Sequence, residues 1–417
     1  MREWDVIVIG GGPAGSTAAT VLAQRGRRVL LLEKSRFPRY QIGESLLPLC
    51  FHVLQRTGVL EKVQGAGFTE KKSVQFITPD GHASQPFYFD THLGEEIGTT
   101  WQVVRSEFDA LLLDHARAQG VEVREETLVT GPIVEGDAIV GVESRSADGT
   151  KATCRAPITI DASGRGGVMM AHARWRVPEP PLNRMAIWTY YRGAKRDPGR
   201  NAGATTTASL PGGGWVWFIP LQDDRVSVGI VDQAEGLFAE TREPERAFLS
   251  RVDDNPWIAE RLREATRDGD LRVTSDFSYR SQHCAMNGAV LTGDAFAFLD
   301  PVFSSGVFLA LRGGEAAAHA VDAALTQGRT DAAAFTEYGE WLCEGMEAMR
   351  ALVHAFYDPD FSFGRAIREA PETRDRITDC LVGDIFTDLS DLIETLRRFA
   401  AIPAPLTHGR VGTEEAA

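Results

Sequence analysis

Three glycines near the start of the chain have a spacing that suits the binding of a diphosphate. Gly10, Gly12 and Gly15 follow the apolar run 5–9 in the pattern Gly-x-Gly-x-x-Gly, and a segment with helical spacing comes next. Glycines there permit a tight turn and bring the backbone close to a pyrophosphate, whose charge the N-terminus of the helix stabilises. Glu33, at the end of a second apolar run, can accept hydrogen bonds from ribose hydroxyls. We therefore predict a dinucleotide site rather than a glycine turn without a ligand.

Two carboxylates at later strand ends indicate how the rest of such a ligand would be held. Asp161 closes the apolar segment 158–161, and Gly293-Asp294 follows another apolar segment at 289–292. A carboxylate at a strand end can bind the ribityl or ribose hydroxyls of an extended cofactor. Gly-Asp alone is typical of an ordinary turn. Together with the N-terminal glycines, it predicts that the dinucleotide is FAD rather than NAD and that Asp294 is a ribityl ligand.

The composition limits the class of protein and its partners. The 417 residues suffice for two packed modules, and 58 acidic against 44 basic residues leave a net charge of −14, which disfavours nucleic acid or an anionic membrane as the main partner. No signal peptide is recognisable, and no apolar stretch approaches the roughly 20 residues of a membrane span. We therefore expect a cytoplasmic protein without stable membrane association. The cysteines are expected to be reduced thiols without a disulfide or metal role; they are Cys50, Cys154, Cys284, Cys343 and Cys380.

The order of the expected elements indicates an α/β fold with an insertion. Strands are predicted at 185–191, 205–210, 215–220 and 225–231, and long helices at 305–326 and 331–357. We predict a Rossmann-like FAD-binding domain, an inserted and mostly antiparallel β-sheet substrate domain, and a helical C-terminal region with a loose tail. The expected boundaries are 1–166 and 281–330 for the discontinuous FAD-binding domain, 167–280 for the substrate domain, and 331–417 for the C-terminal region, with the tail at 403–417.

These features resemble the large flavoprotein family typified by p-hydroxybenzoate hydroxylase, over residues 5–165 and 285–320. The resemblance implies one FAD bound across the first domain, with Arg105 near the flavin and the phosphates and the backbone of Val129 near the adenine. Only one dinucleotide fingerprint is present, so no separate NAD(P)H domain is predicted. The residues expected to bind the cofactor are Gly10, Gly12, Pro13, Ala14, Gly15, Glu33, Lys34, Gly43, Glu44, Ser45, Arg105, Val129, Asp294, Pro301, Ser305, Gly306 and Val307.

Three motifs narrow the resemblance to the flavin-dependent halogenases. They are Phe-Pro-Arg-Tyr-Gln-Ile-Gly-Glu-Ser-Leu-Leu-Pro at 37–48, Trp-Val-Trp-Phe-Ile-Pro at 215–220 and Asp-Pro-Val-Phe-Ser-Ser-Gly-Val at 300–307. The second matches the Trp-x-Trp-x-Ile-Pro motif of these enzymes in full. The likeness to pyrrolyl-carrier-protein halogenases of the pyoluteorin type runs from about residue 5 to residue 360. It implies an enzyme of antibiotic biosynthesis that takes FADH2 from a separate flavin reductase and uses chloride or bromide as co-substrate. Its substrate would be an electron-rich pyrrole or phenol, free or tethered to an acyl carrier protein.

Trp215 and Trp217 are the first candidates for a catalytic role. Alternate residues of a strand face the same way, so the two indoles would project together as an aromatic wall. The resemblance implies that this wall keeps the organic substrate away from the flavin, so that the oxidant reacts with halide. The alternative is an aromatic pair buried in a core. The neighbouring Ile219-Pro220 and the Gly-Glu-Ser motif at 43–45 favour the wall.

The resemblance also implies a lysine that receives the halogen. The family pattern Gly-Phe-x-x-Lys is matched at residues 67–71, which makes Lys71 the candidate. Its amine would hold hypohalous acid by a hydrogen bond or as a haloamine, provided that burial lowers its pKa. Lys72 is an adjacent alternative, and a further one is that both lysines lie on a solvated strand end. Ser73-Val74 replaces the Gly-Ala pair that usually follows the lysine.

The segment 300–307 precedes a helix, whose free N–H groups favour negative charge. We expect the N–H groups of Ser305 and Gly306 to bind the halide and the same helix end to face the reduced flavin near N1 and the C2 carbonyl. Ser304 would assist the transfer near Lys71. Simple capping by serine is the alternative, and it is compatible with these roles. Tryptophan-type halogenases carry a glutamate where this sequence has Phe303, which argues against free tryptophan as the substrate.

Two other functions remain open at this stage. One is an FAD-dependent aromatic monooxygenase or a geranylgeranyl-reductase-like oxidoreductase, because the latter shares the Pro-Arg-x-x-x-Gly-Glu-Ser pattern. The other is a flavin-binding protein without catalysis that acts as an interaction module. The tryptophan motif favours the halogenase. No metal site is predicted, and the protein is expected to be a monomer or a homodimer.

Overall fold

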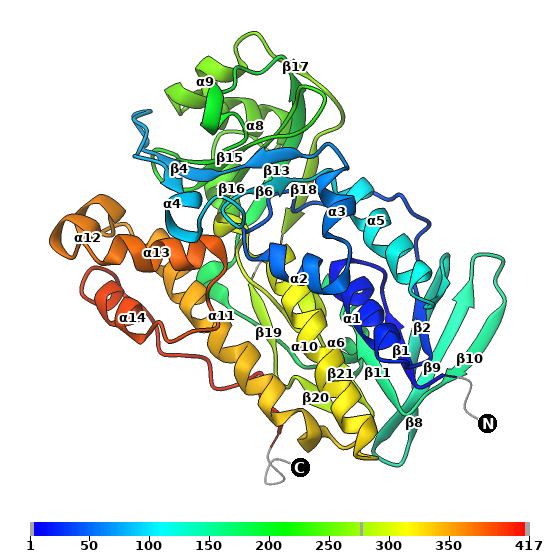
Figure 1. The fold of residues 1–417 in the computed structure, drawn as a ribbon. Coiled ribbons are helices and arrows are strands. Elements are labelled where there is room, and N and C mark those ends of the chain that lie inside the picture. The colour runs from blue at the N-terminus through cyan, green and yellow to red at the C-terminus, as the bar shows by residue number, and fades with distance from the viewer. Residues whose placement is uncertain (1–3, 276–277, 413–417) are drawn as a thin grey trace.

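A six-stranded, mostly parallel sheet forms the first layer of the fold in the computed structural model, which describes residues 4–275 and 278–412 (Figure 1). In spatial order its strands are β20 (Ala285–Met286), β21 (Ala289–Leu291), β11 (Ile158–Asp161), β1 (Val6–Ile9), β2 (Val29–Leu32) and β7 (Glu122–Arg124). The central strand β1 has parallel neighbours on both sides, with Val6 opposite both Ile158 and Val29. Every residue of β1, β2 and β11 is buried, as is typical of parallel strands that are covered on both faces.

Glycines set the distance between the helices and the sheet. Helix α1 (Pro13–Gln24) packs against α10 (Gly306–Thr326) and α5 (Arg105–Ala118). A Cβ atom built on Gly314 of α10 would lie 2.3 Å from the carbonyl oxygen of Ala14, and one built on Gly15 would lie 1.9 Å from the carbonyl oxygen of Gly10. These contacts leave no room for a larger residue, so the N-terminus of α1 lies directly against the end of β1 and the first turns of α10.

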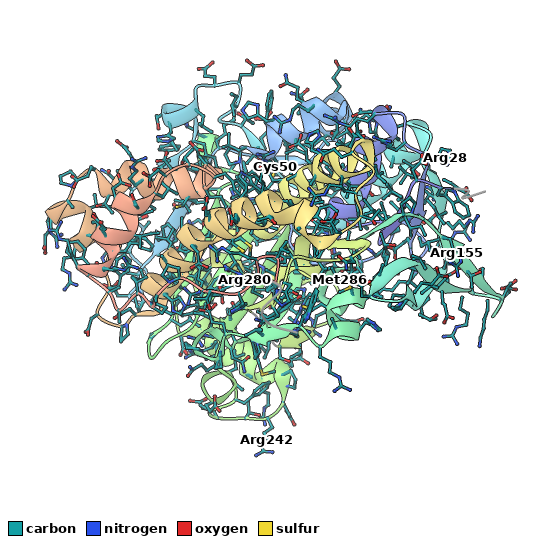
Figure 2. The ribbon with its side chains drawn as sticks, turned by 90° about the horizontal axis from the view of Figure 1, so that it is seen from below. Arg28, Cys50, Arg155, Arg242, Arg280 and Met286 are labelled. Atoms are coloured by element: carbon teal, nitrogen blue, oxygen red, sulfur yellow. The ribbon has the colours of Figure 1, made fainter. Side chains whose placement is uncertain are left out.

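The other face of the parallel sheet is covered by a smaller antiparallel sheet and a short helix. The sheet has the order β10 (Lys151–Arg155), β9 (Ala138–Ser146) and β8 (Thr127–Glu135), and α6 (Val168–Ala173) packs beside β8. Figure 2 shows Arg155 of β10 at the rim of the molecule. Val129, which the resemblance places near an adenine, is a buried residue of β8.

An eight-stranded sheet forms the second large layer, at the top of Figure 1. Its order is β17 (Thr266–Arg267), β13 (Met185–Arg192), β16 (Arg225–Asp232), β15 (Trp215–Pro220), β14 (Thr205–Ser209), β4 (Ser73–Ile77) and β5 (Phe87–Tyr88), and β18 (Arg272–Ser275) also pairs with β13. The pairing is antiparallel except between β14 and β4. The sheet therefore takes two strands from residues 73–88, outside the segment 167–280 from which the sequence predicts it. Helices α7 (Ala234–Leu237), α8 (Pro244–Asp253) and α9 (Pro256–Leu262) follow β16.

Short elements connect the two layers. They are α2 (Cys50–Thr57), α3 (Leu60–Gln64), β3 (Thr69–Lys71), α4 (Asp90–Leu93), β6 (Thr100–Gln102), β12 (Arg176–Pro178), β19 (Tyr279–Ser281) and β22 (Ala297–Phe298). Strand β3 pairs with β6, with Lys71 opposite Thr100, and Gln102 of β6 forms a bridge with Ser45. This pairing brings the predicted lysine beside the Gly-Glu-Ser segment, although 25 residues of chain separate Lys71 from Leu46.

The C-terminal region is helical, as predicted, and its described residues, 331–412, include four α-helices. The expected helix at 331–357 begins as a short 3-10 turn, η6 (Ala332–Phe335), and continues as α11 (Thr336–Tyr357). The other helices are α12 (Phe363–Glu369), α13 (Thr373–Val382) and α14 (Ser390–Arg397). In Figure 1, α11 runs beside α10 and carries the chain back toward the large sheet.

The tail after α14 is not loose, which corrects the prediction for residues 403–412. The Ala404 carbonyl accepts a hydrogen bond from Arg350 at 3.1 Å, and the Gly409 N–H donates to the Gln282 carbonyl at 2.9 Å. Gly409 lies against Arg280, a buried residue near the middle of Figure 2. Hydrogen bonds to α11 and to the segment after β19 thus fix a segment that has no regular structure. Residues 413–417 of the predicted tail lie outside the described residues.

All five cysteines are buried. Among residues 4–275 and 278–412, none of the helices has both the length and the apolar character needed to cross a bilayer.

Candidate active site

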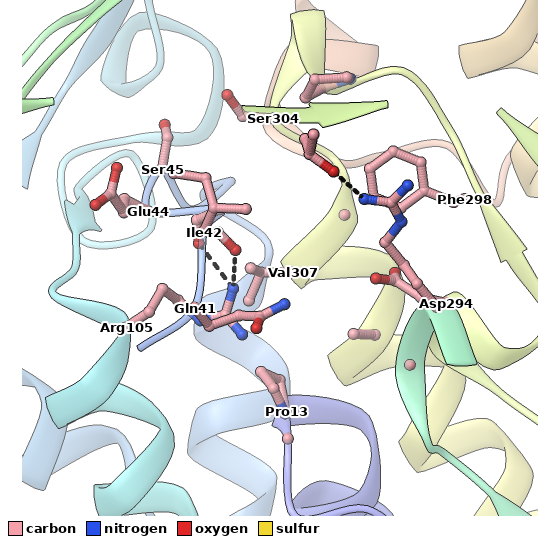
Figure 3. A pocket seen from close by; sticks show the side chains of 18 of the residues that line it. Pro13, Gln41, Ile42, Glu44, Ser45, Arg105, Asp294, Phe298, Ser304 and Val307 are labelled. Atoms are coloured by element: carbon pink, nitrogen blue, oxygen red, sulfur yellow. Dashed lines mark hydrogen bonds between the residues drawn. The ribbon is translucent and has the colours of Figure 1, made fainter. Parts of the chain in front are cut away.

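A cavity of about 440 Å³ lies where the carboxyl ends of the parallel strands face the large sheet. Figure 3 shows Glu44, Ser45 and Arg105 on one side of it and Asp294 and Phe298 on the other. The predicted residues that line it are Gly10, Gly12, Pro13, Ala14, Glu33, Lys34, Gly43, Glu44, Ser45, Arg105, Trp215, Trp217, Asp294, Pro301, Ser304, Gly306 and Val307. The predicted residues that do not line it are Gly15, Lys71, Val129 and Ser305. Residues at distant points of the sequence are therefore brought to one cavity.

The glycine turn leaves an open position at the start of α1. Gly10 has a φ of 99°, and a Cβ atom there would lie 2.5 Å from the carbonyl oxygen of Ala162. Gly12 precedes α1, and no side chain caps this helix, so its first N–H groups are available to an anion. The one atom within 4 Å of a Cβ built on Gly12 is Nη2 of Arg39, at 3.6 Å. Arg39 is a cavity-lining cation that we did not predict, although it stands within the motif at 37–48.

Glu33 is held in place at the end of β2. Its carboxylate accepts hydrogen bonds from the N–H groups of Gly11 at 2.7 Å and Ser35 at 2.8 Å. The side chain is buried and lines the cavity. Each carboxylate oxygen has a second lone pair, so Glu33 can still accept a hydrogen bond from a ligand hydroxyl.

A buried carboxylate, Asp294, lies near two arginines that line the cavity. Burial raises the pKa of Asp294 to about 6, and the nearby charges of Arg105 and Arg165 oppose that rise. Arg105 donates to the carbonyl oxygens of Ile42 at 2.6 Å and Gly43 at 3.1 Å, as the dashed lines in Figure 3 show. Its Nε donates to Asp109 at 2.8 Å. Arg105 thereby fixes the loop that carries the Gly-Glu-Ser motif.

The two tryptophans of β15 form one wall of the cavity, on the same side, as the alternation predicts. Their ring centroids are 6.0 Å apart, and both residues are buried. The indole N–H of Trp217 donates to Ser227 at 3.0 Å. A Cβ atom on Gly229 of the neighbouring strand would lie 2.1 Å from the Trp217 ring, so glycine makes the space that this indole fills.

Trp215 is also tied to the C-terminal region, which the sequence did not predict. Its indole N–H donates to the hydroxyl of Tyr357 at 2.8 Å, and Tyr357 donates to Asp300 at 2.8 Å. Asp300 is buried, and its other oxygen accepts from the N–H of Val302 at 3.0 Å. A single tyrosine at the end of α11 therefore links the tryptophan wall to the segment 300–307. No local sequence signal marks Tyr357, because its partners are more than 50 residues away.

The two adjacent lysines lie in opposite environments. Lys71 has no exposed surface, and its amine donates to Ser45 Oγ at 2.8 Å and to the Leu46 carbonyl at 3.0 Å. Burial lowers the pKa of Lys71 to about 7. The side chain of Lys72 is 36% exposed and pairs with Glu70 at 3.1 Å. The alternative in which both lysines are solvated is therefore wrong for Lys71.

The Lys71 amine lies one hydrogen bond behind the cavity wall. Ser45 lines the cavity, and its hydroxyl is also 2.8 Å from the hydroxyl of Thr205. Gln102 donates to the same Thr205 hydroxyl at 2.8 Å. Thr205 and Gln102 come from β14 and β6, and neither stands in a motif, so sequence reasoning missed them.

The segment 300–307 turns sharply before α10. Pro301–Phe303 form a short 3-10 turn, Ser304 has a left-handed φ of 58°, and no side chain caps α10. Ser304 and Gly306 line the cavity, whereas Ser305 does not. The ring of Phe303 packs against Phe356, with 5.9 Å between the ring centroids. The roles of Ser304, Ser305 and Gly306 toward a halide stay predictions.

These features fit a bound FAD. The open Gly12 position and the uncapped α1 suit a pyrophosphate, Glu33 and Asp294 offer carboxylates for hydroxyl groups, and the cavity joins these points. Val129 lies outside the cavity lining, so its predicted contact with the adenine is not tested by this geometry.

Comparison with known proteins decides the family. The sequence profile described as Tryptophan halogenase matches residues 5–95 and 83–381. The chain belongs to the tryptophan halogenase family. It is 36% identical to a protein of Chondromyces crocatus named Tryptophan 2-halogenase, over 85% of this chain and 67% of that protein. It is 32% identical to a brominase of 1H-pyrrole-2-carbonyl peptidyl-carrier protein from Pseudoalteromonas luteoviolacea, over 92% and 93% of the two chains. The solved structure of the flavin-dependent brominase Bmp2 superposes with a TM-score of 0.85 at 30% identity, covering 95% of this chain and 97% of that one.

The family assignment establishes the class of reaction. This halogenase is an FAD-dependent oxidoreductase that halogenates aromatic substrates, and the halogenase interpretation is thereby favoured over a monooxygenase or a geranylgeranyl-reductase-like enzyme. When reduced FAD is bound, it would react with oxygen and a halide to supply the electrophilic halogen for this chemistry. The residues of this chain that would hold the cofactor are those of the glycine turn, Glu33 and Asp294.

The open position at Gly12 gives a first test. We expect Gly12→Val to fold but to lose FAD affinity by more than about 100-fold, because the added methyl groups enter the space for the pyrophosphate (~3 kcal/mol). Titration of the purified protein with FAD, followed by flavin fluorescence, measures this loss. Gly15→Ala is the contrasting variant, because its Cβ atom would meet the Gly10 carbonyl oxygen at 1.9 Å. It should lower the melting temperature of the protein itself. Tight FAD binding by Gly12→Val would contradict the placement of the pyrophosphate.

The burial of Lys71 gives a second test, on stability. In the folded state the pKa of Lys71 is about 7, against an ordinary value of 10.5. Between these values the unfolded chain binds more protons, so the folded protein gains stability as pH rises, by about 1.4 kcal/mol for each pH unit. Lys71→Met lacks this gain. The advantage of the variant in free energy of unfolding should therefore shrink by about 2 kcal/mol between about pH 7 and about pH 9, measured by chemical denaturation.

Lys72→Met is the matched control for the second test. It removes an exposed lysine one residue away, so its stability should follow the wild-type dependence on pH. Parallel pH curves for Lys71→Met and the wild type would show that Lys71 is not buried as an amine with a lowered pKa.

Proposed function

We propose that this halogenase transfers chlorine or bromine to a pyrrole or a phenol, and that Lys71 presents the electrophilic halogen to the ring. The observation that carries the proposal is the full burial of the Lys71 amine one hydrogen bond behind Ser45, which lines the cavity. Because burial lowers its pKa to about 7, this amine is partly neutral near neutral pH and offers a lone pair to a halogen. The Lys72 side chain is 36% exposed and its amine pairs with Glu70, so it is the less suitable candidate.

The amine has two ways of handling hypohalous acid. As an ammonium group it donates a hydrogen bond to the acid, whose halogen then replaces the ring hydrogen while water leaves. As a neutral amine it forms a nitrogen–halogen bond and releases water, and the halogen then passes to the ring carbon while the ring hydrogen returns to nitrogen. Both routes end with the same products and an unchanged lysine.

Other residues of the cavity would separate the oxidation from the halogen transfer. The paired indoles of Trp215 and Trp217 form a rigid apolar wall, which we propose excludes the organic ring from the cofactor. Ser304, which follows the 3-10 turn Pro301–Phe303, also lines the cavity, and we propose that it assists the transfer of the halogen toward Lys71. The N–H groups at the start of α10 would hold the halide, at Ser305 and Gly306.

The proposed substrate class rests on Phe303 and on one relative. Phe303 is buried against Phe76 and Phe356, so no carboxylate occupies the position where a less reactive ring would need a base. Pyrroles and phenols are activated enough to react without one. The relative from Pseudoalteromonas luteoviolacea is named for a pyrrole on a peptidyl-carrier protein, which supports a carrier-bound substrate here. The relative named Tryptophan 2-halogenase represents the competing substrate class.

The cofactor would arrive already reduced. The chain has one dinucleotide fingerprint, so we propose that a separate flavin reductase delivers FADH2. Substrate-stimulated oxidation of NADPH by the purified protein alone would contradict this part of the proposal.

Mass spectrometry of products tests the substrate class directly. The protein would be supplied with FAD, a flavin reductase, NADH and bromide, and with free and carrier-bound pyrroles and phenols, with tryptophan as the comparison. We expect the bromine isotope pattern in pyrrole or phenol products and none in tryptophan. Bromination of tryptophan in preference to every pyrrole and phenol would overturn the proposed substrate class.

Lys71→Ala tests the proposed carrier of the halogen. The variant should bind FAD as the wild type does and still consume reduced FAD and oxygen, because Lys71 does not line the cavity. Product halogenation should fall by more than about 100-fold, as is usual when a group that acts on the reacting atoms is removed. Oxygen consumption and product mass are measured in the same reaction.

Lys72→Ala is the control for that experiment. It removes the same charge from the exposed neighbour and should keep substantial halogenation activity. An inactive Lys72→Ala together with an active Lys71→Ala would move the role to Lys72. Near wild-type halogenation by both variants would refute a lysine carrier in this protein.

A further inference from the structure

A second, smaller cavity of about 150 Å³ lies beyond the Gly-Glu-Ser loop, and Glu44 belongs to the walls of both cavities. Gln41 and Arg105 are also shared, whereas Tyr40 and Tyr190 line the smaller cavity alone. Nothing in the halogen chemistry described above uses this second space. Its boundary with the main cavity includes a buried carboxyl group.

A chain of hydrogen bonds runs from the protein surface to that carboxyl group. The hydroxyl of Tyr190 donates to Glu44 Oε1 at 2.7 Å, and the hydroxyls of Tyr190 and Tyr40 are 3.2 Å apart. The Tyr40 oxygen accepts from the indole N–H of Trp188 at 2.7 Å. Because a hydroxyl has one proton and that of Tyr190 goes to Glu44, Tyr40 is left to donate to Tyr190. Tyr40 is 39% exposed and Glu44 is 3% exposed, so the chain leads from a residue at the surface to a buried one.

Glu44 is placed to receive and pass on a proton, because its buried carboxyl lies between the Tyr190 hydroxyl and the main cavity. Burial raises its pKa, and the hydrogen bonds from Tyr190 and Ser227 and the charges of Arg105 and Arg225 oppose that rise. Its second oxygen, Oε2, is also buried. A proton on the carboxyl removes the cost of burying its negative charge.

The charged groups around the two tyrosines are balanced. The Arg272 guanidinium lies 3.6 Å from the centre of the Tyr40 ring, and that of Arg225 lies 4.5 Å from the centre of the Tyr190 ring. Arg225 is also paired with Asp268 at 2.9 Å, and Asp270 lines the same cavity. Arginine stays protonated throughout the accessible pH range, so these neighbours do not titrate with the relay.

The reaction itself needs a supply of protons. Each turnover brings a halide and an anionic reduced flavin into the site, together with dioxygen and an aromatic C–H group, and releases neutral oxidised flavin, a carbon–halogen bond and water. The flavin is oxidised and dioxygen is reduced. The hydrogens of the water come from the reduced flavin, from the aromatic ring, and from one proton for each negative charge that entered. The reaction must therefore draw protons from solvent.

We propose that Tyr40, Tyr190 and Glu44 form a proton relay that carries protons from solvent, along the second cavity, to the wall of the main cavity. A proton is taken up at the Tyr40 hydroxyl as its own proton passes to Tyr190, and the Tyr190 proton passes to Glu44. The Glu44 carboxyl then releases a proton on the cofactor side and is recharged from the tyrosines. The inference rests on the halogenase activity and is independent of Lys71 and of the identity of the aromatic ring.

The test uses Tyr190→Phe and Tyr40→Phe in the full-length protein loaded with FAD. Reduced FAD and bromide are supplied without an aromatic substrate, and the formation of hypobromous acid is measured, so the result does not depend on the substrate class. At about pH 8 both variants should lose about tenfold or more in rate, because a relay is interrupted where protons are scarce. The loss should be smaller at about pH 6, and the solvent deuterium isotope effect should increase, since proton delivery limits the rate. FAD affinity should stay within about twofold of the wild type.

A second readout does not involve turnover. Infrared spectra of the protein without FAD should show a protonated-carboxyl band that is absent in Glu44→Gln, shifts in Tyr190→Phe, and persists to a higher pH than ordinary carboxyl groups. Absence of such a band in the wild type near neutral pH would overturn the role of Glu44 as a proton carrier.

Tyr191→Phe is the matched control. Tyr191 is the next residue of the same strand, and it faces the other side of the sheet, where its ring stacks on Phe248. The same substitution there should leave the rate, the pH profile and the isotope effect unchanged.

The relay is refuted if Tyr190→Phe and Tyr40→Phe both keep the wild-type rate and isotope effect at about pH 8. It is also refuted if the loss is equal at both pH values and the isotope effect does not change, since that is the behaviour of a purely structural defect. If Tyr190→Phe fails to fold, the half-exposed Tyr40→Phe decides the question alone.

Discussion

The removal of the Lys71 amine from water is the constraint on which the arrangement of the site depends. A lysine without exposed surface is tolerated only where polar partners accept hydrogen bonds from its amine. Here the Ser45 hydroxyl and the Leu46 carbonyl accept them. Both partners belong to the loop that follows β2, whereas the lysine ends β3. The pairing of β3 with β6, and the bridge from β6 to Ser45, hold the two segments at this distance. The position of the amine is therefore a property of the packed protein and not of the lysine motif alone.

Successive residues of the loop at 43–46 form hydrogen bonds with different parts of the protein. The Gly43 carbonyl accepts from Arg105, the Glu44 carboxyl from Tyr190, and the Ser45 hydroxyl from Lys71. One short loop therefore contacts the cofactor cavity, the second cavity and the buried amine. A shift of this loop by one residue would misplace all three contacts together.

Local patterns predicted the parts of the site that depend on local geometry. The glycine turn, Glu33 and the tryptophan pair could be read from spacing, because a βαβ unit and a strand fix their directions. Lys71 was distinguished from Lys72 by motif spacing, and burial in the structure explains the difference between the two lysines. Tyr357, Thr205 and Tyr190 could not be predicted, since each contacts the site from a part of the chain more than 100 residues away from its partner there. The tail was misjudged because hydrogen bonds, and not regular structure, hold residues 403–412.

The contact of Tyr357 with Trp215 and Asp300 ties the C-terminal region to the wall of the active site. Exchange of C-terminal helices among related halogenases, as in the construction of chimeric enzymes, would replace the residue that satisfies a buried indole N–H and a buried carboxylate. Such exchanges preserve the site only when the tyrosine at the end of α11 is transferred with its two partners. The natural unit of recombination in this fold therefore crosses the apparent boundary between the sheet and the C-terminal helices.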